Sequence, residues 1–431
     1  MDATRPAAPA IAGLGLTEQD VIDAYVYVLA RYLVIRQERT DIAEEGVDYN
    51  VIKFNQLGKA EFVNPNLDVA YLEAWIAVDE RTPVIIEIPA VEGRYYTAQI
   101  MDEWADVLYN VNERTFPARP HGTFALCLKG SNPAIPEGAH RLDLPSKKAK
   151  MLARVERKGD DKGAVALQRA FRIIPAGKPT IEPAVEVPLF TNAAPIAVDA
   201  FARPMLTSVL DSAPDAMALA PGMRARAEAI ADYVAKDAAR RTAIDTVIKQ
   251  KALPALVKFI RSDAGDNRGG WIATTGKPTG FGEDYWFRTA ANYAGIWWNN
   301  NQEVVYFVGE KDAAGAPLDG ANAYRLHFEA ADVPQGHVNA YWSLTLMSLP
   351  DYRVVPNGLN RYGFNNRSKF QFGADGSLDL YLAAERPAQA PESNWLPAPA
   401  GKPFTLAMRL YVPKPEVLSG AYYVPPIERA P

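Results

Sequence analysis

Two heptapeptides, YYTAQIM at residues 95–101 and YWSLTLM at residues 341–347, share an aromatic pair, then a hydroxyl residue, and a closing methionine. A second match follows in the same order, between GTFALCL at 122–128 and GSLDLYL at 376–382. Both matches are rich in aromatic and aliphatic residues, as strands are. Because they are repeated in order, about 250 residues apart, they favour an internal duplication. The sequence therefore predicts two antiparallel β-sandwich or jelly-roll-like domains.

The rest of the chain predicts a mainly β protein with a helical middle. Residues 17–39 have apolar side chains at helical spacing, and Thr17 can cap that helix. The Ala-rich, charged run at 223–250 predicts one long helix, which Pro254 should break or kink. Since strands do not alternate with helices, a parallel doubly wound sheet is not expected.

These patterns divide the chain into four regions. We expect an amino-terminal extension and helix at residues 1–45 and a first β domain at 46–180. A helical connecting region is expected at 181–300, before a second β domain at 301–431.

Composition limits the classes of partner. The chain has 431 residues and a net charge of −5, so nothing in its overall charge favours a nucleic acid. No apolar run is long enough to span a membrane, and Cys127 is the single cysteine, which excludes an internal disulfide. The Ala/Pro-rich amino end lacks the apolar core of a signal peptide but suits a mature exported protein. The compartment stays open, with a periplasmic location favoured over a cytoplasmic one.

The sequence lacks the common catalytic signatures. It has no HExxH, GxSxG, Walker A or GxGxxG motif, and its four histidines are scattered. His327 and Glu329 alternate on one strand and are the best candidate metal pair, although a strand histidine without metal is the ordinary interpretation. We therefore expect no cofactor and no metal site, and chemistry limited to acid–base steps or binding.

The stretch NPNLDVAYLEAWIAVD, residues 64–79, has two interpretations. Pro65 and Asn66 favour a turn, and an aspartate at this place can bond the backbone two residues on, so the run is a plausible turn before a strand. Alternatively, its polar side chains form the wall of a pocket. Asn64 is assigned to the turn, whereas Asn66 and Asp68 are the functional candidates.

Together with its neighbours, this stretch resembles a known family. NPNLDVAY, RTPVIIEIP, GRYYTAQIMDEW and HGTFALCLKG look like the core of the family named DUF1254. DAAGAPLDGANAYRLHF, AYWSLTLM, NRYGF, DGSLDLYL and SNWLPAPAGKPFTLAMRLYVPK resemble its usual companion, DUF1214. The resemblance implies two β-sandwich domains in a family of mostly uncharacterised, often exported bacterial proteins, and it supplies no mechanism.

The resemblance also marks positions. The recurrent polar residues of the family fall here on Asn66, Asp68, Tyr71, Tyr96, Gln99, Asp102, Trp342, Ser343, Thr345, Arg361, Tyr362, Asp375, Asn394, Trp395 and Arg409. One departure is Val69, where the family usually has threonine after the motif aspartate. If that hydroxyl normally contacts substrate, the substrate or the chemistry here differs.

Four of these residues are the catalytic candidates. If Asp68 and Asp102 converge, burial and mutual charge would raise one pKa and provide an acid and a base. Tyr71 would donate a proton, and Arg361 would hold an anionic group by two hydrogen bonds. The plain alternative is that Asp102 and Arg361 form a structural ion pair. The substrate-binding candidates are Asn66, Tyr96, Gln99, Trp342, Thr345, Tyr362 and Trp395.

The leading hypothesis is a cofactor-independent hydrolase or lyase that acts on a small or oligomeric organic substrate by carboxylate and tyrosine acid–base chemistry. The alternative is a non-catalytic binding protein for a carbohydrate or a hydrophobic small molecule. A third interpretation is a structural protein whose motifs only specify the fold. We expect no nucleic acid and no membrane span, and either a monomer or a homodimer.

Overall fold

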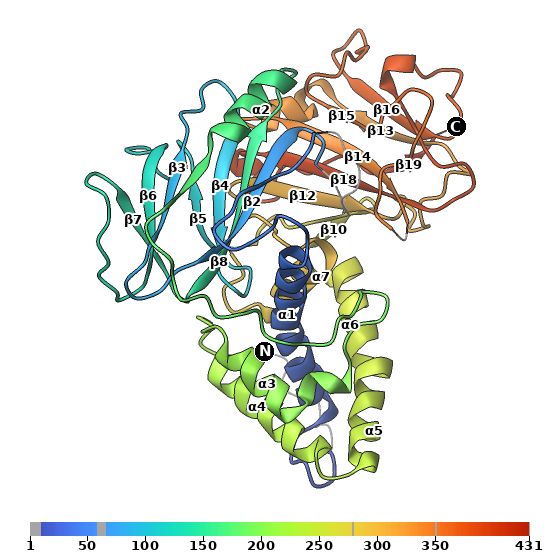
Figure 1. The fold of residues 1–431 in the computed structure, drawn as a ribbon. Helices are drawn as coiled ribbons and strands as arrows, with labels where there is room; N and C mark the ends of the chain where they lie inside the picture. Colours follow the sequence, from blue (N-terminus) through green and yellow to red (C-terminus); the bar gives the residue numbers. More distant parts are fainter. Residues whose placement is uncertain (1–9, 58–65, 278–279, 350, 431) are drawn as a thin grey trace.

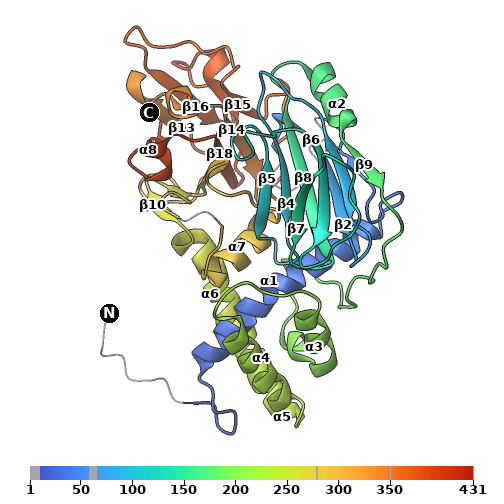
Figure 2. The same cartoon turned by 90° about the vertical axis from the view of Figure 1, so that its left-hand side faces the viewer.

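The computed structural model describes residues 10–57, 66–277, 280–349 and 351–430. Two β-rich halves lie side by side, and a helical region lies below them in the view of Figure 1. The view turned by 90° shows the same arrangement (Figure 2). Asn64, assigned to a turn, and the first nine residues lie outside the described ranges.

The amino-terminal β half contains two sheets, one with the strand order β1-β2-β8-β4-β5 and one with the order β7-β6-β3-β9. Apolar side chains from both sheets form one core. Its elements are β1 (Lys53–Phe54), β2 (Val69–Ala77), β3 (Val84–Ile88), β4 (Tyr96–Met101), β5 (Val107–Val111), β6 (Gly122–Leu128), β7 (His140–Leu144), β8 (Lys148–Glu156), α2 (Asp161–Ala170) and β9 (Arg172–Pro175).

The carboxyl-terminal β half also contains two sheets, ordered β10-β11-β12-β18-β14-β15 and β17-β16-β13-β19, over a second core. Its elements are β10 (Asp266–Arg268), β11 (Trp271–Ala273), β12 (Val304–Gly309), β13 (Tyr324–Phe328), β14 (Trp342–Ser348), β15 (Gly363–Asn365), β16 (Leu378–Ala383), β17 (Trp395–Pro397), β18 (Phe404–Tyr411), α8 (Pro415–Leu418) and β19 (Glu428–Arg429). Short 3₁₀ turns lie at Ala330–Asp332, Pro334–His337 and Glu392–Asn394.

The two halves have matching strand orders. If β1 is taken to correspond to β11, β2 to β12, and so on to β9 and β19, the strand order in each sheet of the first half repeats in the second half. β10 is an additional edge strand. The two heptapeptides of the sequence lie on the matching strands β4 and β14, and the second pair of motifs lies on β6 and β16.

The expectation of wholly antiparallel sheets was wrong for one strand pair in each half. β6 pairs with β7 in parallel, and so does β16 with β17. Sequence patterns give strand positions, whereas a long connection such as the one from β6 to β7 leaves the direction of pairing to the tertiary fold. The chain is thus β-rich, with four antiparallel or mixed sheets and a few helices.

The helical region joins the amino-terminal helix to the middle of the chain in one core. Thr17 caps α1 through a capping box with Asp20, as expected. The helices are α1 (Glu18–Ile42), α3 (Arg203–Asp211), α4 (Ala220–Val234), α5 (Ala238–Val247), α6 (Leu253–Lys258) and α7 (Tyr285–Gly295), with a 3₁₀ turn at Val198–Phe201 and π-helical turns at Ile248–Ala252 and Phe259–Asp263.

The prediction of one long helix at 223–250 was wrong. The chain breaks after Val234, and the Asp237 side chain accepts a hydrogen bond from the Arg240 backbone N–H, which caps a new helix. Pro254 lies in the first turn of α6, directly after a π-helical turn, so the wider turn accommodates the proline.

Candidate functional site

A pocket of about 230 Å³ lies where the two β halves meet. It is formed by the residues before β2, the loop between β8 and α2, the start of β14 and the turn after β15. We call it the Asp68 pocket. Its lining residues are Leu67, Asp68, Glu156, Arg157, Lys158, Gly159, Asp161, Tyr341, Asn365, Asn366 and Arg367.

The half-buried Asp68 carboxyl is held from the opposite β half. Asn365 Nδ2 donates a hydrogen bond to Asp68 Oδ1 at 2.6 Å, and the Asp68 backbone N–H donates to Asn66 Oδ1 at 2.8 Å. No hydrogen bond to Asp68 Oδ2 is found among the described residues. Burial raises the pKa of Asp68, although the Asn365 hydrogen bond and the charges of Arg409 and Arg157 oppose this. Asp68 is thus a carboxyl that keeps its proton to a higher pH than an ordinary aspartate does.

Three basic side chains surround the pocket, and two of them are already engaged. Arg157 binds both carboxylate oxygens of Asp161 at 2.7 Å, and Lys158 donates to the Gly93 carbonyl. Arg367 is exposed, and within the described ranges its guanidinium forms no hydrogen bond or ion pair. Its head lies against the backbone of Gly159, where an added Cβ would be 2.7 Å from Nη2. Arg367 is therefore available to an anion.

Asn66 connects the pocket to buried tyrosines. Its Nδ2 donates to the Tyr341 hydroxyl at 3.1 Å and also to the Tyr411 hydroxyl. The rings of Tyr341 and Tyr411 stack with centroids 4.3 Å apart, and Tyr95 of the other half packs edge-on against both. Burial raises the pKa of Tyr341 well above its usual value. This phenol therefore stays neutral at the pocket wall.

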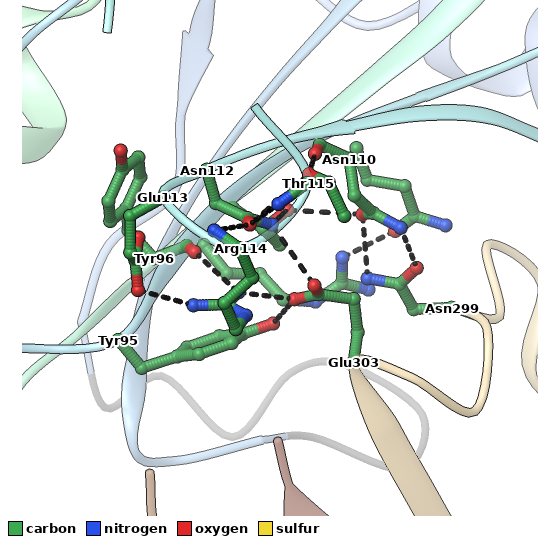
Figure 3. A network of polar contacts seen from close by, with 12 residues as sticks. Tyr95, Tyr96, Asn110, Asn112, Glu113, Arg114, Thr115, Asn299 and Glu303 are labelled. Carbon is green, nitrogen blue, oxygen red and sulfur yellow. Dashed lines mark hydrogen bonds and ion pairs between the residues drawn. The ribbon is translucent and has the colours of Figure 1, made fainter. Parts of the chain in front are cut away.

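A second polar cluster lies between the halves, and its side chains bind one another (Figure 3). Glu303, with 1% of its side chain exposed, accepts hydrogen bonds from Tyr95 Oη at 3.0 Å, Asn112 Nδ2 at 3.0 Å and Arg114 Nη2 at 2.7 Å. Arg114 also lies over the Tyr95 ring, 5.0 Å from its centroid. We call these four residues the Glu303 cluster. They join the halves through an ion pair between Arg114 and Glu303.

Strand register relates the two clusters. Asp68 and Glu303 each precede the first residue of matching strands, β2 and β12. Tyr95 and Tyr341 each precede the matching strands β4 and β14.

The asparagines and arginines match in the same way. Asn112 follows Val111, which pairs with Ala98, as Asn365 follows Phe364, which pairs with Leu344. Arg114 and Arg367 then follow at the same spacing. Each of their backbone N–H groups donates to the preceding asparagine Oδ1, at 2.9 and 2.8 Å. The Asp68 pocket and the Glu303 cluster are thus built from equivalent residues.

Asp68 and Asp102, which would have to converge to provide an acid and a base in one pocket, lie at opposite ends of one sheet. β2 and β4 both run antiparallel to β8, and Asp68 precedes β2 whereas Asp102 follows β4. Asp102 Oδ1 accepts hydrogen bonds from the backbone N–H groups of Trp104 and Asp106 in a tight turn. Burial, and next the charge of Asp106, raise the pKa of Asp102 to about 7.

The other two catalytic candidates also lie outside the pocket lining. Tyr71 is in β2, with its ring under the Arg154 guanidinium at 5.5 Å. Arg361 donates to the backbone carbonyls of Glu392 and Trp395, so it fastens a loop of the carboxyl-terminal half. The structural ion pair between Asp102 and Arg361 that the sequence left open is not present between these described residues.

The predicted substrate-binding residues mostly support the fold. Gln99 and Thr345 occupy matching strand positions, and each accepts a hydrogen bond from a buried arginine. Asn66 is the member of this group that contacts the pocket, through Tyr341. Tyr96 and Trp342 are 1% exposed core residues, Tyr362 bonds Asn360, and Trp395 Nε1 donates to the Ala383 carbonyl.

The sequence reasoning missed Asn365 and Arg367. A signal was present, because VNERT at 111–115 and FNNRS at 364–368 share an asparagine, an arginine two positions later and a hydroxyl residue. DVAY at 68–71 and EVVY at 303–306 repeat in the same way. These two matches extend the repeats already seen in β4 and β6.

No metal-binding group of three or more His, Cys, Asp or Glu side chains exists in the described parts of the chain. His327 Nδ1 lies 2.7 Å from Asp379, and its Nε2 lies 3.3 Å from Glu329. The first of these contacts raises the pKa of His327 through a hydrogen bond, which is the behaviour of a paired strand histidine. Within the described residues, no helix is both long and apolar enough to cross a bilayer.

Two family models match the chain in the predicted order. Residues 50–175 match DUF1254 and residues 303–415 match DUF1214, both described as proteins of unknown function. The chain therefore carries a DUF1254 region followed by a DUF1214 region. The first match covers most of the amino-terminal β half, and the second covers β12 to β18 of the other half.

One solved structure shows a similar fold over nearly the whole chain. The crystal structure of the VPA0106 protein from Vibrio parahaemolyticus is similar with a TM-score of 0.64 and 20% identity, over 96% of this chain and all of that one. An uncharacterised protein from Burkholderia cenocepacia gives a TM-score of 0.41 and 12% identity, over 94% of this chain and 87% of that one. No protein with a curated description matches the chain.

Proposed function

We propose that the Asp68 pocket is the active site of a cofactor-independent hydrolase or lyase that acts on a small or oligomeric organic substrate. The observation that carries this proposal is the Asp68 carboxyl, which lines a pocket of about 230 Å³ and has a raised pKa caused by burial. A carboxyl that keeps its proton to higher pH can act as a general acid, and its ionised form as a general base.

Each neighbour has a definite part in this proposal. Asn365 holds Asp68 Oδ1 at 2.6 Å, so Oδ2 is left to exchange a proton with the substrate. Tyr341 supplies an aromatic wall, and Asn366 supplies an amide for hydrogen bonds to the substrate. Asp68 is the only one of the four predicted catalytic residues that the proposal retains at the reacting atoms.

The test compares wild type with Asp68→Asn, which removes the titrating proton and keeps the shape. Both proteins are screened by thermal shift against sugars, lactones, terpenoids and carboxylic acids, and stabilising compounds are then assayed for turnover. We expect turnover by wild type and a loss of about a hundredfold or more in the variant. Asp102→Asn, which changes a buried carboxyl outside the pocket, is the control and should retain activity. Equal turnover by wild type and Asp68→Asn would refute the proposal.

A binding protein for a carbohydrate or a hydrophobic small molecule is the second candidate. It is favoured by the other carboxylates of the pocket, because both have partners. Asp161 binds Arg157, and Glu156 accepts a hydrogen bond from the Tyr95 backbone N–H at 2.9 Å. Asp68 then has no second acid in the pocket lining that lacks a hydrogen-bond or ion-pair partner. This function predicts a ligand that stabilises wild type and Asp68→Asn equally and is not converted by either.

We also propose that the two halves are copies of one jelly-roll-like unit. The support is the common strand order of the halves and the equivalence of Asp68 with Glu303. The proposal predicts that the halves superpose strand for strand with these two acids at one place. A superposition that needs a different strand order contradicts it.

A further inference from the structure

The acid of the Asp68 pocket is one methylene group shorter than the equivalent acid of the Glu303 cluster. In the Glu303 cluster, the longer side chain brings its carboxylate to Arg114 at 2.7 Å and to Asn112 at 3.0 Å. In the Asp68 pocket, the shorter side chain reaches Asn365, the equivalent of Asn112, at 2.6 Å. No hydrogen bond or ion pair joins Asp68 to Arg367 in the described parts of the chain, and both residues line the pocket.

We propose that Arg367 binds the carboxylate of a small organic acid in the Asp68 pocket, in the place that the Glu303 carboxylate takes for Arg114. This inference rests on the proposed function, because it assigns a substrate class to the same site. A guanidinium presents paired N–H donors that match the two oxygens of a carboxylate. Asn365, Asn366 and the Tyr341 ring line the space for the rest of the ligand.

The charges around the pocket fit this assignment. The groups that face Asp68 are Glu156 and Arg157 from the end of β8, Arg409 from β18, and Tyr341 with Asn365 from the carboxyl-terminal half. A neutral Asp68 would donate a hydrogen bond to the ligand carboxylate, so that the two acids share a proton as paired carboxyl groups do. The raised pKa of Asp68 supports this sharing.

The first experiment measures binding of three acids, hexanoate, phenylacetate and succinate, and of their uncharged amides, by isothermal titration calorimetry. We expect at least one acid to bind wild type more tightly than its amide. Arg367→Ala should weaken that binding by about tenfold to a hundredfold, as expected for hydrogen bonds to a charged group. Arg240→Ala, which removes the same charge from α5 in the helical region, is the matched control and should bind like wild type.

Three results would overturn the inference. They are equal binding of acids and amides, unchanged acid binding by Arg367→Ala, and no saturable binding of any acid to wild type at about 10 mM.

A second experiment needs no external ligand. Asp68→Glu adds the missing methylene, so its carboxylate should reach Arg367 as Glu303 reaches Arg114. We expect a higher melting temperature, loss of acid binding, and loss of the thermal gain when Arg367→Ala is added. If the gain from Asp68→Glu is the same with and without Arg367, the assignment of Arg367 is wrong.

The inference and the proposed function can fail separately. Acid binding that depends on Arg367, with no turnover of any compound, would support the inference and refute the enzyme. Turnover that depends on Asp68 but is unaffected by Arg367→Ala would retain the enzyme and refute the carboxylate site.

Discussion

Glu303 and Asp68 precede matching strands in the two β halves, but Glu303 is enclosed by its hydrogen-bond donors, whereas Asp68 lines a pocket. Glu303 is 1% exposed and holds three hydrogen-bond donors of the other half (Figure 3), whereas Asp68 is half-buried beside a pocket and holds one. The longer acid completes an ion pair that joins the halves, and the shorter acid leaves the equivalent arginine, Arg367, without a partner among the described residues. One scaffold thus provides a structural contact at one position and a candidate site at the other.

Removing the acid of the Glu303 cluster should have the largest effect on stability. Glu303→Ala removes the buried carboxylate that accepts hydrogen bonds from Arg114, Asn112 and Tyr95, and breaking a buried pair from one side costs about 3 to 5 kcal/mol. The free energy of unfolding, measured by urea denaturation, should fall by this amount.

Asp68→Ala is the matched control for that change. It removes one hydrogen bond from Asn365 and a carboxyl with a raised pKa, so the loss should be about 1 kcal/mol or less. Equal losses for the two variants would show that the clusters do not differ in the way described here.

Alanine substitution of the two equivalent arginines should change the free energy of unfolding in the same order, with the larger loss in the Glu303 cluster, but by a smaller amount. Arg114→Ala leaves the Glu303 carboxylate buried without its cation, and we expect a loss of about 2 to 3 kcal/mol. Arg367→Ala removes an exposed side chain, and its effect should stay within about 0.5 kcal/mol. Urea denaturation of both variants checks this, and a large loss for Arg367→Ala would assign that residue to the fold.

The pH dependence of Asp68→Asn should be the smallest effect. Burial raises the pKa of Asp68 in the folded protein above the ordinary aspartate pKa of 3.8, which applies in the unfolded chain. The folded protein therefore binds this proton more tightly than the unfolded chain does. The stability due to this group is therefore complete below that value and is lost as pH rises through the folded-state pKa. Relative to wild type, Asp68→Asn should therefore gain stability as pH rises above about 4.

Asp79→Asn is the control of opposite sign. A hydrogen bond from the Thr180 backbone N–H is the main cause that lowers the pKa of Asp79 to about 2, so its ionised form stabilises the fold. Relative to wild type, this variant should lose stability as pH rises from about 2 to above 4. Urea denaturation across the pH range measures both variants, and a flat difference for Asp68→Asn would contradict the raised pKa.

Local pattern was sufficient for most elements and for one residue of the candidate pocket. The strands β4, β6, β14 and β18 follow their apolar runs, and α1 begins where Thr17 caps it. Asp68 was chosen because short polar side chains stood before a strand. The break between α4 and α5 was missed, because a good capping aspartate outweighed the helix propensity of the alanines around it.

By itself the sequence determined the β-rich class, the two family regions and the repeated strands, and it made Asp68 a candidate, because each depends on residues close together in the chain. Only the tertiary structure decided which of the two acids forms an ion pair between the halves, Glu303, and which lines a pocket, Asp68. The partner of Asp68 is 297 residues away at Asn365, and that of Glu303 is 191 residues away at Asn112. Strand direction and the packing of the halves set such contacts, and they also separate Asp102 from Asp68, since periodicity carries no information on which ends of two strands meet.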